Sequence, residues 1–175
     1  MNGNGMFDAL MARGPHPDIA ESGHAIFAPF MGPWDIEIFD LEGDGARRVS
    51  RGEWHFGWVL EGRAVQDVFI VPPRGERRNG LPVRKNRCAT TLRVFDPGSG
   101  AWRVHYFNPV DRSEETLIAR RDGKNVVQTG VNTQGVSLRQ TFTDVTDTSF
   151  VVYREASKAD GAWKLDAEYF ARRPK

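Results

Sequence analysis

Three charged side chains stand at strand positions that otherwise carry apolar residues, and their types could do chemistry. Asp67 lies within Val65 to Phe69, and Arg139 and Arg154 lie in two later segments of alternating polarity. A carboxylate in apolar surroundings can transfer protons, and an arginine there can hold a carboxylate or phosphate through its bidentate fork. The alternative is structural: Asp67 pairs with an interior arginine, or the charges lie at a rim in water.

The face of each residue follows from the hairpin turns, because a two-residue turn fixes the register of the strands that it joins. A turn at Glu61-Gly62 places Phe56 opposite Asp67 and Trp54 opposite Phe69. The residues that then share one face are Trp54, Phe56, Trp58, Val65, Asp67 and Phe69. This face predicts an aromatic wall with one carboxylate in its middle.

Two later turns predict a second apolar face that carries both arginines. A turn at Asp160-Gly161 places Tyr169 opposite Val152, Ala167 opposite Arg154 and Leu165 opposite Ala156. A turn at Asp147-Thr148 extends that face to Thr141 and Arg139, so Arg139 and Arg154 become near neighbours. The opposite face is expected to meet solvent and carries Gln140, Glu155, Asp166 and Glu168.

The histidines are weaker candidates for chemistry. His105, mid-strand between Trp102 and Phe107, could act as a general base, although a hydrogen-bonded structural histidine is the commoner case. The four histidines lack the spacing of a metal site, and no G-x-S-x-G precedes a helix. We therefore expect no metal and no hydrolase triad.

These residues must be positioned by strands, because from Trp34 onward apolar and polar residues alternate with a period of two, and the segments are separated by residues typical of hairpin turns. About ten strands are expected, over residues 34–38, 48–60, 63–72, 87–96, 101–108, 115–121, 124–129, 136–145, 149–156 and 162–172. Consecutive antiparallel strands with no crossover helix avoid open edges by closing into an up-and-down barrel, with a β-sandwich as the alternative. A barrel of this size has room for a ligand.

The N-terminal part predicts one short helix over residues 18–28 that plugs an end of the barrel. Asp18 and Glu21 have capping-box spacing, and apolar residues follow at helical intervals until Pro29 and the Gly32-Pro33 pair. Residues 1–17 are expected to be an extension, and residues 18–175 a single domain.

Composition excludes several classes of protein. The chain has 175 residues, with 24 Lys and Arg against 23 Asp and Glu, so no basic excess favours nucleic acid. The chain has one cysteine, Cys88, which excludes an internal disulfide. The sequence shows neither a signal peptide nor a long apolar run, so we expect neither secretion nor membrane insertion. We expect a cytoplasmic protein. Residues 74–87 carry a basic cluster, which is either a solvated loop or a lid that attracts an anionic ligand.

The segments at the two ends of the strand region resemble those of a known superfamily. Gly32-Pro33-Trp34 opens the first strand and Glu168 to Arg173 closes the last. This resembles the calycins, which include lipocalins and fatty-acid-binding proteins, and more closely the bacterial family called domain of unknown function 1579. The further motifs that carry the likeness are residues 58–63, 94–100, 140–147 with Phe150, and 163–173. The resemblance implies a lipocalin-like barrel in which Trp34 packs against an arginine, here Arg172, at the closed end; related nitrobindin-type barrels would make His105 an axial haem ligand, but we predict no cofactor.

Three functions remain open from the sequence. The first is a binding protein for a small, largely apolar or amphipathic molecule with an anionic end. The ligand residues would be Trp54, Phe56, Trp58, Asp67, Phe69, Arg139, Arg154 and Tyr169. The second is a cyclase, isomerase or dehydratase that uses Asp67 or His105. The third is a filled structural barrel that forms a homodimer through outward apolar residues such as Val68, Ile70 and Val151.

Overall fold

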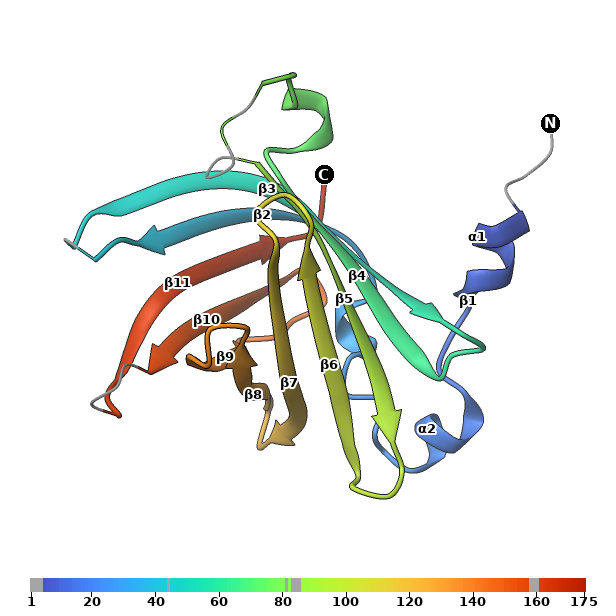
Figure 1. The fold of residues 1–175 in the computed structure, drawn as a ribbon. Coiled ribbons are helices and arrows are strands. Elements are labelled where there is room, and N and C mark those ends of the chain that lie inside the picture. Colours follow the sequence, from blue (N-terminus) through green and yellow to red (C-terminus); the bar gives the residue numbers. More distant parts are fainter. Residues whose placement is uncertain (1–4, 44, 81, 83–85, 158–160) are drawn as a thin grey trace.

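Ten antiparallel strands close into an up-and-down barrel in the computed structural model, which describes residues 5–43, 45–80, 82, 86–157 and 161–175. Each strand pairs with the next, and the last pairs with the first, so the β-barrel expected from the alternating pattern is confirmed (Figure 1). The strands are β2 (Gly32–Leu41), β3 (Arg47–Val59), β4 (Ala64–Val71), β5 (Arg87–Asp96), β6 (Ala101–Asn108), β7 (Ser113–Asp122), β8 (Asn125–Asn132), β9 (Ser137–Thr143), β10 (Ser149–Ser157) and β11 (Trp163–Arg172).

Four short elements accompany the barrel: α1 (Gly5–Leu10), β1 (Met11–Ala12), α2 (Pro17–Glu21) and the 3-10 turn η1 (Ala28–Phe30), all before β2. The expected helix over residues 18–28 is wrong in extent, because Gly23 adopts a φ of +73° just after the first turns. The cap also differs from the expected capping box, since the Nδ1 atom of His16 accepts the Asp18 amide at 3.3 Å. A second 3-10 turn, η2 (Arg74–Glu76), follows β4.

Gly62 holds the N-terminal segment against the turn between β3 and β4. The Gly62 carbonyl accepts the His16 amide at 3.0 Å. Gly62 has a φ of +80°, and a Cβ there would lie 2.3 Å from the Gly14 oxygen. Only glycine fits both the backbone angle and this close approach.

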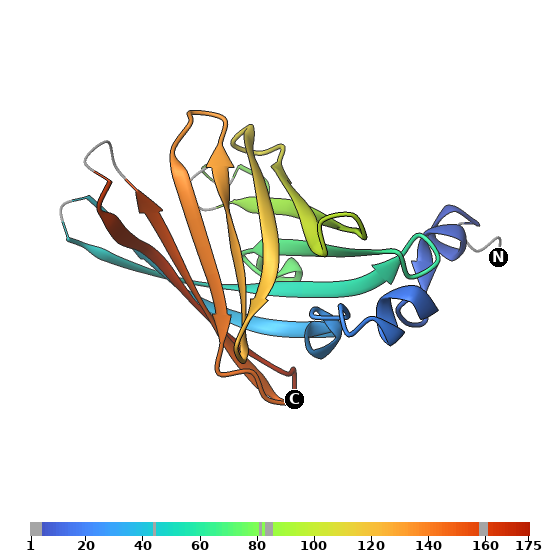
Figure 2. The ribbon, with the colours of Figure 1, turned by 90° about the horizontal axis from the view of Figure 1, so that it is seen from below.

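The N-terminal segment lies at one end of the barrel (Figure 2), and its apolar side chains join the core there. The buried side chains that it contributes are Ile19, Ile26, Phe27 and Phe30. Phe30 contacts Phe150 edge-on with ring centroids 5.0 Å apart, and Phe27 contacts Trp102 in the same way at 5.3 Å. This half of the barrel is therefore filled by aromatic rings, whose preferred edge-to-face geometry adds to the burial of their surface.

Trp34 lies at this closed end and packs against an arginine, but the arginine is Arg173 rather than the expected Arg172. The Cζ atom of Arg173 lies 3.5 Å from the centroid of the buried Trp34 ring, and its Nη1 donates to the Met31 carbonyl at 2.8 Å. Arg172 is the last strand residue and is exposed, because the alternation of β11 turns its side chain outward. Arg173 lies just past the strand, where the chain crosses the barrel end.

The turn-based registers are confirmed at one hairpin and wrong at another. Trp54 lies opposite Phe69 and Phe56 opposite Asp67, as expected. The β9–β10 pair is shifted by one residue, so Arg154 lies opposite Gln140 rather than Thr141. The cause is a longer connection: Asp144 takes a φ of +51°, and Thr146 forms hydrogen bonds with Ser149. A one-residue shift moves every β9 side chain to the other face.

A β-bulge changes the β10–β11 pair between Arg154 and Glu155. Val152 lies opposite Tyr169 and Arg154 opposite Ala167, as expected, but Leu165 lies opposite Glu155 rather than Ala156. The extra residue of the bulge is Asp166. A bulge re-aims the residue that it inserts, and Asp166, expected on the solvent face, reaches Arg154.

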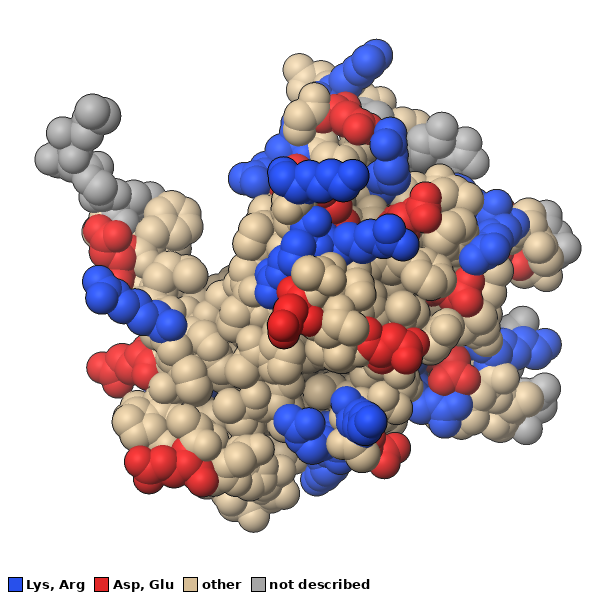
Figure 3. Space-filling view, turned by 180° about the vertical axis from the view of Figure 1, so that it is seen from behind, with Lys and Arg blue, Asp and Glu red and all other residues tan. Residues whose placement is uncertain are grey.

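The outer surface carries charges of both signs. Lysine and arginine side chains alternate with aspartate and glutamate over the face seen in Figure 3, which agrees with a net charge of +1. Within the described ranges, no helix has the length and apolar character needed to span a membrane.

Candidate functional site

A cavity of about 330 Å³ occupies the half of the barrel away from the N-terminal segment. Its walls come from the far ends of the strands, such as Asp40 at the end of β2 and Asn132 at the end of β8. Apolar, aromatic and polar side chains all contribute to its walls, and the most deeply buried of them include Asp67, Arg93 and Gln128. The residues that line the cavity include Trp54, Asp67, Phe69, Arg87, Thr91, Arg93, Tyr106, Asn108, Glu115, Gln128, Gln140, Arg154, Asp166 and Tyr169.

The deepest charges form a fully buried pair. Asp67 on β4 and Arg93 on β5 each have 1% of the side chain exposed, and the Nη1 atom of Arg93 donates to the Oδ2 atom of Asp67. The guanidinium also lies 4.9 Å from the Phe27 ring centroid. A buried charge is tolerated when it is paired and hydrogen-bonded, and both conditions hold for Arg93. Asp67 therefore forms the interior salt bridge of the structural interpretation, and it does so through its Oδ2 atom.

Hydrogen bonds continue from this pair across the barrel to its mouth. The Nε atom of Arg93 donates to Gln128 Oε1 at 3.0 Å, and Gln128 Nε2 donates to Gln140 Oε1 at 2.8 Å. Gln140 Nε2 donates to Glu115 Oε2 at 3.4 Å. The chain of side chains fixes the orientation of both amides, because each must present its oxygen to one neighbour and its nitrogen to the next.

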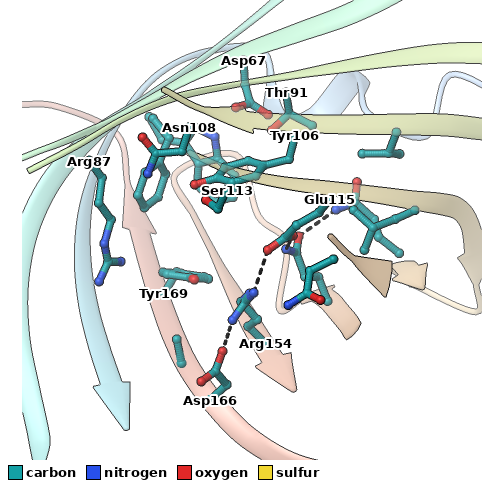
Figure 4. A pocket seen from close by; sticks show the side chains of 18 of the residues that line it. Asp67, Arg87, Thr91, Tyr106, Asn108, Ser113, Glu115, Arg154, Asp166 and Tyr169 are labelled. Atoms are coloured by element: carbon teal, nitrogen blue, oxygen red, sulfur yellow. Dashed lines mark hydrogen bonds and ion pairs between the residues drawn. The ribbon is translucent and has the colours of Figure 1, made fainter. Parts of the chain in front are cut away.

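Arg154 on β10 ends this chain at the mouth. Its Nη2 donates to Glu115 Oε1 at 2.7 Å, and its Nη1 donates to Asp166 Oδ2. Figure 4 shows Glu115 and Asp166 on two sides of the Arg154 guanidinium. Arg154 is thus shared between two carboxylates. A guanidinium in this state has less to offer an anionic ligand than an unpaired one.

Two tyrosines border the cavity as neutral phenols. Burial raises the pKa of Tyr106 well above its usual value, and the nearby negative charge of Glu115 acts in the same direction. Burial likewise raises the pKa of Tyr169, against the opposing effect of Arg154. The Tyr169 ring packs edge-on against Phe69 and Trp54, with centroids 5.9 and 6.2 Å apart. The site therefore offers flat aromatic surface together with protonated hydroxyl groups.

Five of the eight expected ligand residues line the cavity: Trp54, Asp67, Phe69, Arg154 and Tyr169. Phe56 and Trp58 share the inward face with them but belong to the filled half, where Phe56 contacts Phe30 and Trp58 contacts Trp102. The aromatic wall expected from the β3–β4 register is thus divided between the core and the cavity.

Arg139 and His105 lie on the outer face of the barrel. Arg139 forms a bidentate pair with Glu155, at 2.7 and 2.8 Å, and stacks over the Trp163 ring, so its expected place beside Arg154 is wrong. The shifted register of β9 is the reason, and it brings Gln140 inward instead. His105 is exposed and stacks on Phe107. Neither residue lines the cavity.

Arg93, Glu115 and Gln128 are the central cavity residues that the sequence reasoning missed. Arg93 could have been found from the Pro97–Gly100 turn, whose register places it opposite Val104 and on the same face as Trp102. Gln140 and Asp166 were assigned to solvent, and only the irregular turn and the bulge bring them inward. The alternation of polarity carries no sign of either irregularity.

The described part of the basic segment 74–87 is tied to the barrel by several contacts. Arg74 Nε donates to Glu53 Oε2 at 2.9 Å, and Arg77 Nη1 donates to the Val71 and Arg87 carbonyls. Arg87 pairs with Asp40 and lines the cavity. Arg84 and Lys85 of this segment lie outside the described residues. The segment thus contributes one cavity residue, and its Arg74 and Arg77 side chains contact other protein groups.

The fold and the site together define a class: a closed ten-stranded antiparallel β-barrel with one end filled and a polar-lined cavity in the other half. Searches against protein-family models and curated proteins return no match for the chain. Within the described ranges, no group of three or more histidine, cysteine or carboxylate side chains is arranged to hold a metal ion.

Proposed function

We propose that the protein binds a small organic molecule inside the barrel. The observation that carries this proposal is the cavity of about 330 Å³, whose walls combine aromatic side chains with an ordered set of polar groups. Ligand pockets in proteins have volumes of about 300–1,000 Å³ and combine apolar surface with a few oriented polar groups. This volume is at the lower end of that range and suits a molecule of one or two rings.

The charges around the cavity support a ligand without a strong anionic end. Arg93 is paired with Asp67, Arg87 with Asp40, and Arg154 with two carboxylates. An anion would have to compete with these carboxylates for each guanidinium, and it would meet their charge at short range. The sequence predicted a ligand with an anionic end from two neighbouring arginines. Arg139 cannot contact a ligand in the cavity, and Arg154 is already paired with two carboxylates.

The same pairs favour binding over proton transfer. A general acid or base must be able to reach a substrate proton within hydrogen-bonding distance and exchange it. Asp67 and Glu115 each hold an arginine, and His105 is outside the barrel. We therefore propose a binding protein rather than an enzyme. The position of Trp34 under Arg173 supports the proposed kinship with lipocalin-like barrels, and a cytoplasmic location and a homodimer stay predictions.

The test fills the cavity and asks whether binding disappears. Ala167 is buried and lines the cavity, so Ala167→Phe places a ring in that space. Thr129→Phe adds the same ring on the exposed outer face of β8 as a matched control. A library of one- and two-ring compounds is screened by ligand-observed NMR against the wild type and both variants, each checked for folding by its amide spectrum. We expect hits with the wild type and Thr129→Phe that vanish with Ala167→Phe; a library without hits, or hits that survive Ala167→Phe, would contradict the proposal.

A further inference from the structure

Three of the residues that line the cavity carry a buried polar atom with no hydrogen-bond partner among the described residues. These atoms are Trp54 Nε1, Asp67 Oδ1 and Asn108 Nδ2. The described residues contain only two other such side-chain atoms, His24 Nδ1 and Ser50 Oγ. An unpaired buried polar group is costly, and more than nine in ten find a partner in native proteins. Their concentration at one cavity indicates that its occupant supplies the missing partners.

The direction of each missing hydrogen bond is defined by chemistry. Asp67 Oδ1 belongs to a carboxylate whose other oxygen accepts from Arg93, so it needs a donor. The indole nitrogen of Trp54 is a donor and needs an acceptor. Asn108 uses its Oδ1 atom to accept the Val110 amide at 3.1 Å, which leaves the Nδ2 group as the free donor. A molecule that satisfies these atoms therefore needs one hydrogen-bond donor and at least one acceptor.

The charge that such a molecule can carry follows from the neighbours of Asp67. The Arg93 guanidinium neutralises the Asp67 charge, so a cation brought to Oδ1 also approaches Arg93. An anion brought to Asn108 or Trp54 enters a cavity that also contains Asp67 and Glu115. Both ions would also lose hydration that a neutral molecule does not have to give up. A neutral ligand avoids all three costs.

We propose that the ligand is an uncharged ring compound with a hydrogen-bond donor and a carbonyl-type acceptor, as in a lactam or a hydroxy-ketone. Its donor binds Asp67 Oδ1, and its acceptor binds Asn108 Nδ2 or Trp54 Nε1. Its ring packs on Phe69 and Tyr169. This inference rests on the proposed function, because it assigns the chemistry of the molecule that the cavity holds. Ordered water is the competing occupant, since it too can donate and accept.

The experiment compares four probes of similar shape and different polar groups. 2-Quinolinone presents a lactam N–H and carbonyl, 2-methylnaphthalene presents neither, 2-naphthoate is an anion, and 2-naphthylmethylammonium is a cation. Affinities are measured by titration with ¹⁵N-labelled protein, and the site is read from the Trp54 indole and Asn108 side-chain signals. We expect 2-quinolinone to bind with shifts of both signals and at least about tenfold tighter than the other three, because unpaired groups remain when they bind.

One variant isolates the proposed hydrogen bond. Asn108→Asp keeps the oxygen that accepts the Val110 amide and replaces the free donor with an acceptor. We expect it to weaken 2-quinolinone about tenfold or more. Asn125→Asp makes the same change at the β7–β8 hairpin, away from the cavity, and should leave the affinity unchanged.

The outcomes separate this inference from the proposed function. If another probe binds in the cavity as tightly as 2-quinolinone, or if Asn108→Asp binds it normally, the assigned ligand chemistry is wrong while the binding function stands. That result would leave water as the partner of the three groups. If none of the four probes shifts a cavity signal at millimolar concentration, both the ligand chemistry and the binding function are contradicted.

Discussion

Replacing Asp67 with asparagine isolates the energetic role of the Asp67–Arg93 pair. The substitution keeps the size and shape of the side chain and removes its charge. Arg93 then remains 1% exposed with its charge uncompensated by Asp67, while its Nε bond to Gln128 at 3.0 Å stays available. The uncompensated charge of Arg93 dominates the loss of stability, because no other carboxylate among the described residues pairs with Arg93.

The expected cost is about 3–5 kcal/mol of the free energy of unfolding, the range measured when one partner of a buried ion pair is removed. The Gln128 bond and the Phe27 ring, 4.9 Å from the guanidinium, place the value toward the lower end. The double variant Asp67→Leu, Arg93→Met removes both charges with similar volume. We expect it to recover most of the loss, since apolar replacement of both partners is often neutral or stabilising.

Urea unfolding at neutral pH, followed by tryptophan fluorescence, measures these differences. Asp35→Asn is the matched control, because Asp35 is exposed on the outer face of β2, and it should change stability by less than about 0.5 kcal/mol. A cost below about 1 kcal/mol for Asp67→Asn would show that the carboxylate does not compensate a buried charge. A double variant less stable than Asp67→Asn would show the same.

Three further predictions follow from particular contacts and are measured by urea unfolding. Arg173→Met should cost about 1–2 kcal/mol, because it removes the Met31 carbonyl bond and the stacking on Trp34, whereas Arg172→Met should be near neutral; equal effects would contradict the assignment. The hydrogen bonds between Glu155 and Arg139 lower the pKa of Glu155, so the wild type should be more stable than Glu155→Gln at pH 7. This difference in stability should decrease below about pH 4.5 and vanish below the lowered pKa, and a difference independent of pH would contradict the prediction. Gly130→Ala should cost about 3 kcal/mol, because its Cβ would lie 1.9 Å from the Thr116 carbonyl oxygen, while Gly98→Ala has room; a neutral Gly130→Ala would contradict the close approach.

The alternating pattern and the turns predicted the barrel well because both are local signals. The period of two assigned ten strands in the right order, and the Glu61-Gly62 turn placed Asp67 opposite Phe56. The prediction failed where local geometry departed from the simplest turn. The connection through Asp144 shifted β9 by one residue and moved Arg139 outward. Both faces of β9 carry polar residues, so the sequence pattern fits either face turned inward and did not reveal the shift.

The polar half of the cavity was the hardest part to predict, because it depends on residues that meet across the barrel. Arg93 on β5 reaches Gln128 on β8, and Arg154 on β10 reaches Glu115 on β7. Neither β5 and β8 nor β7 and β10 are joined by a hairpin turn, so turn registers alone do not predict these pairings. The sequence indicated that charge lay inside the barrel and left open that Asp67 pairs with an interior arginine, but it did not indicate that this arginine is Arg93 or that Arg154 meets two carboxylates.

A crystal structure of the protein with 2-quinolinone shows directly whether the cavity binds an uncharged lactam. We expect density for one molecule inside the barrel, with its N–H toward Asp67 Oδ1 and its carbonyl within hydrogen-bonding distance of Asn108 Nδ2 or Trp54 Nε1. Water peaks alone at these three atoms, or 2-quinolinone bound only on the outer surface, would contradict it.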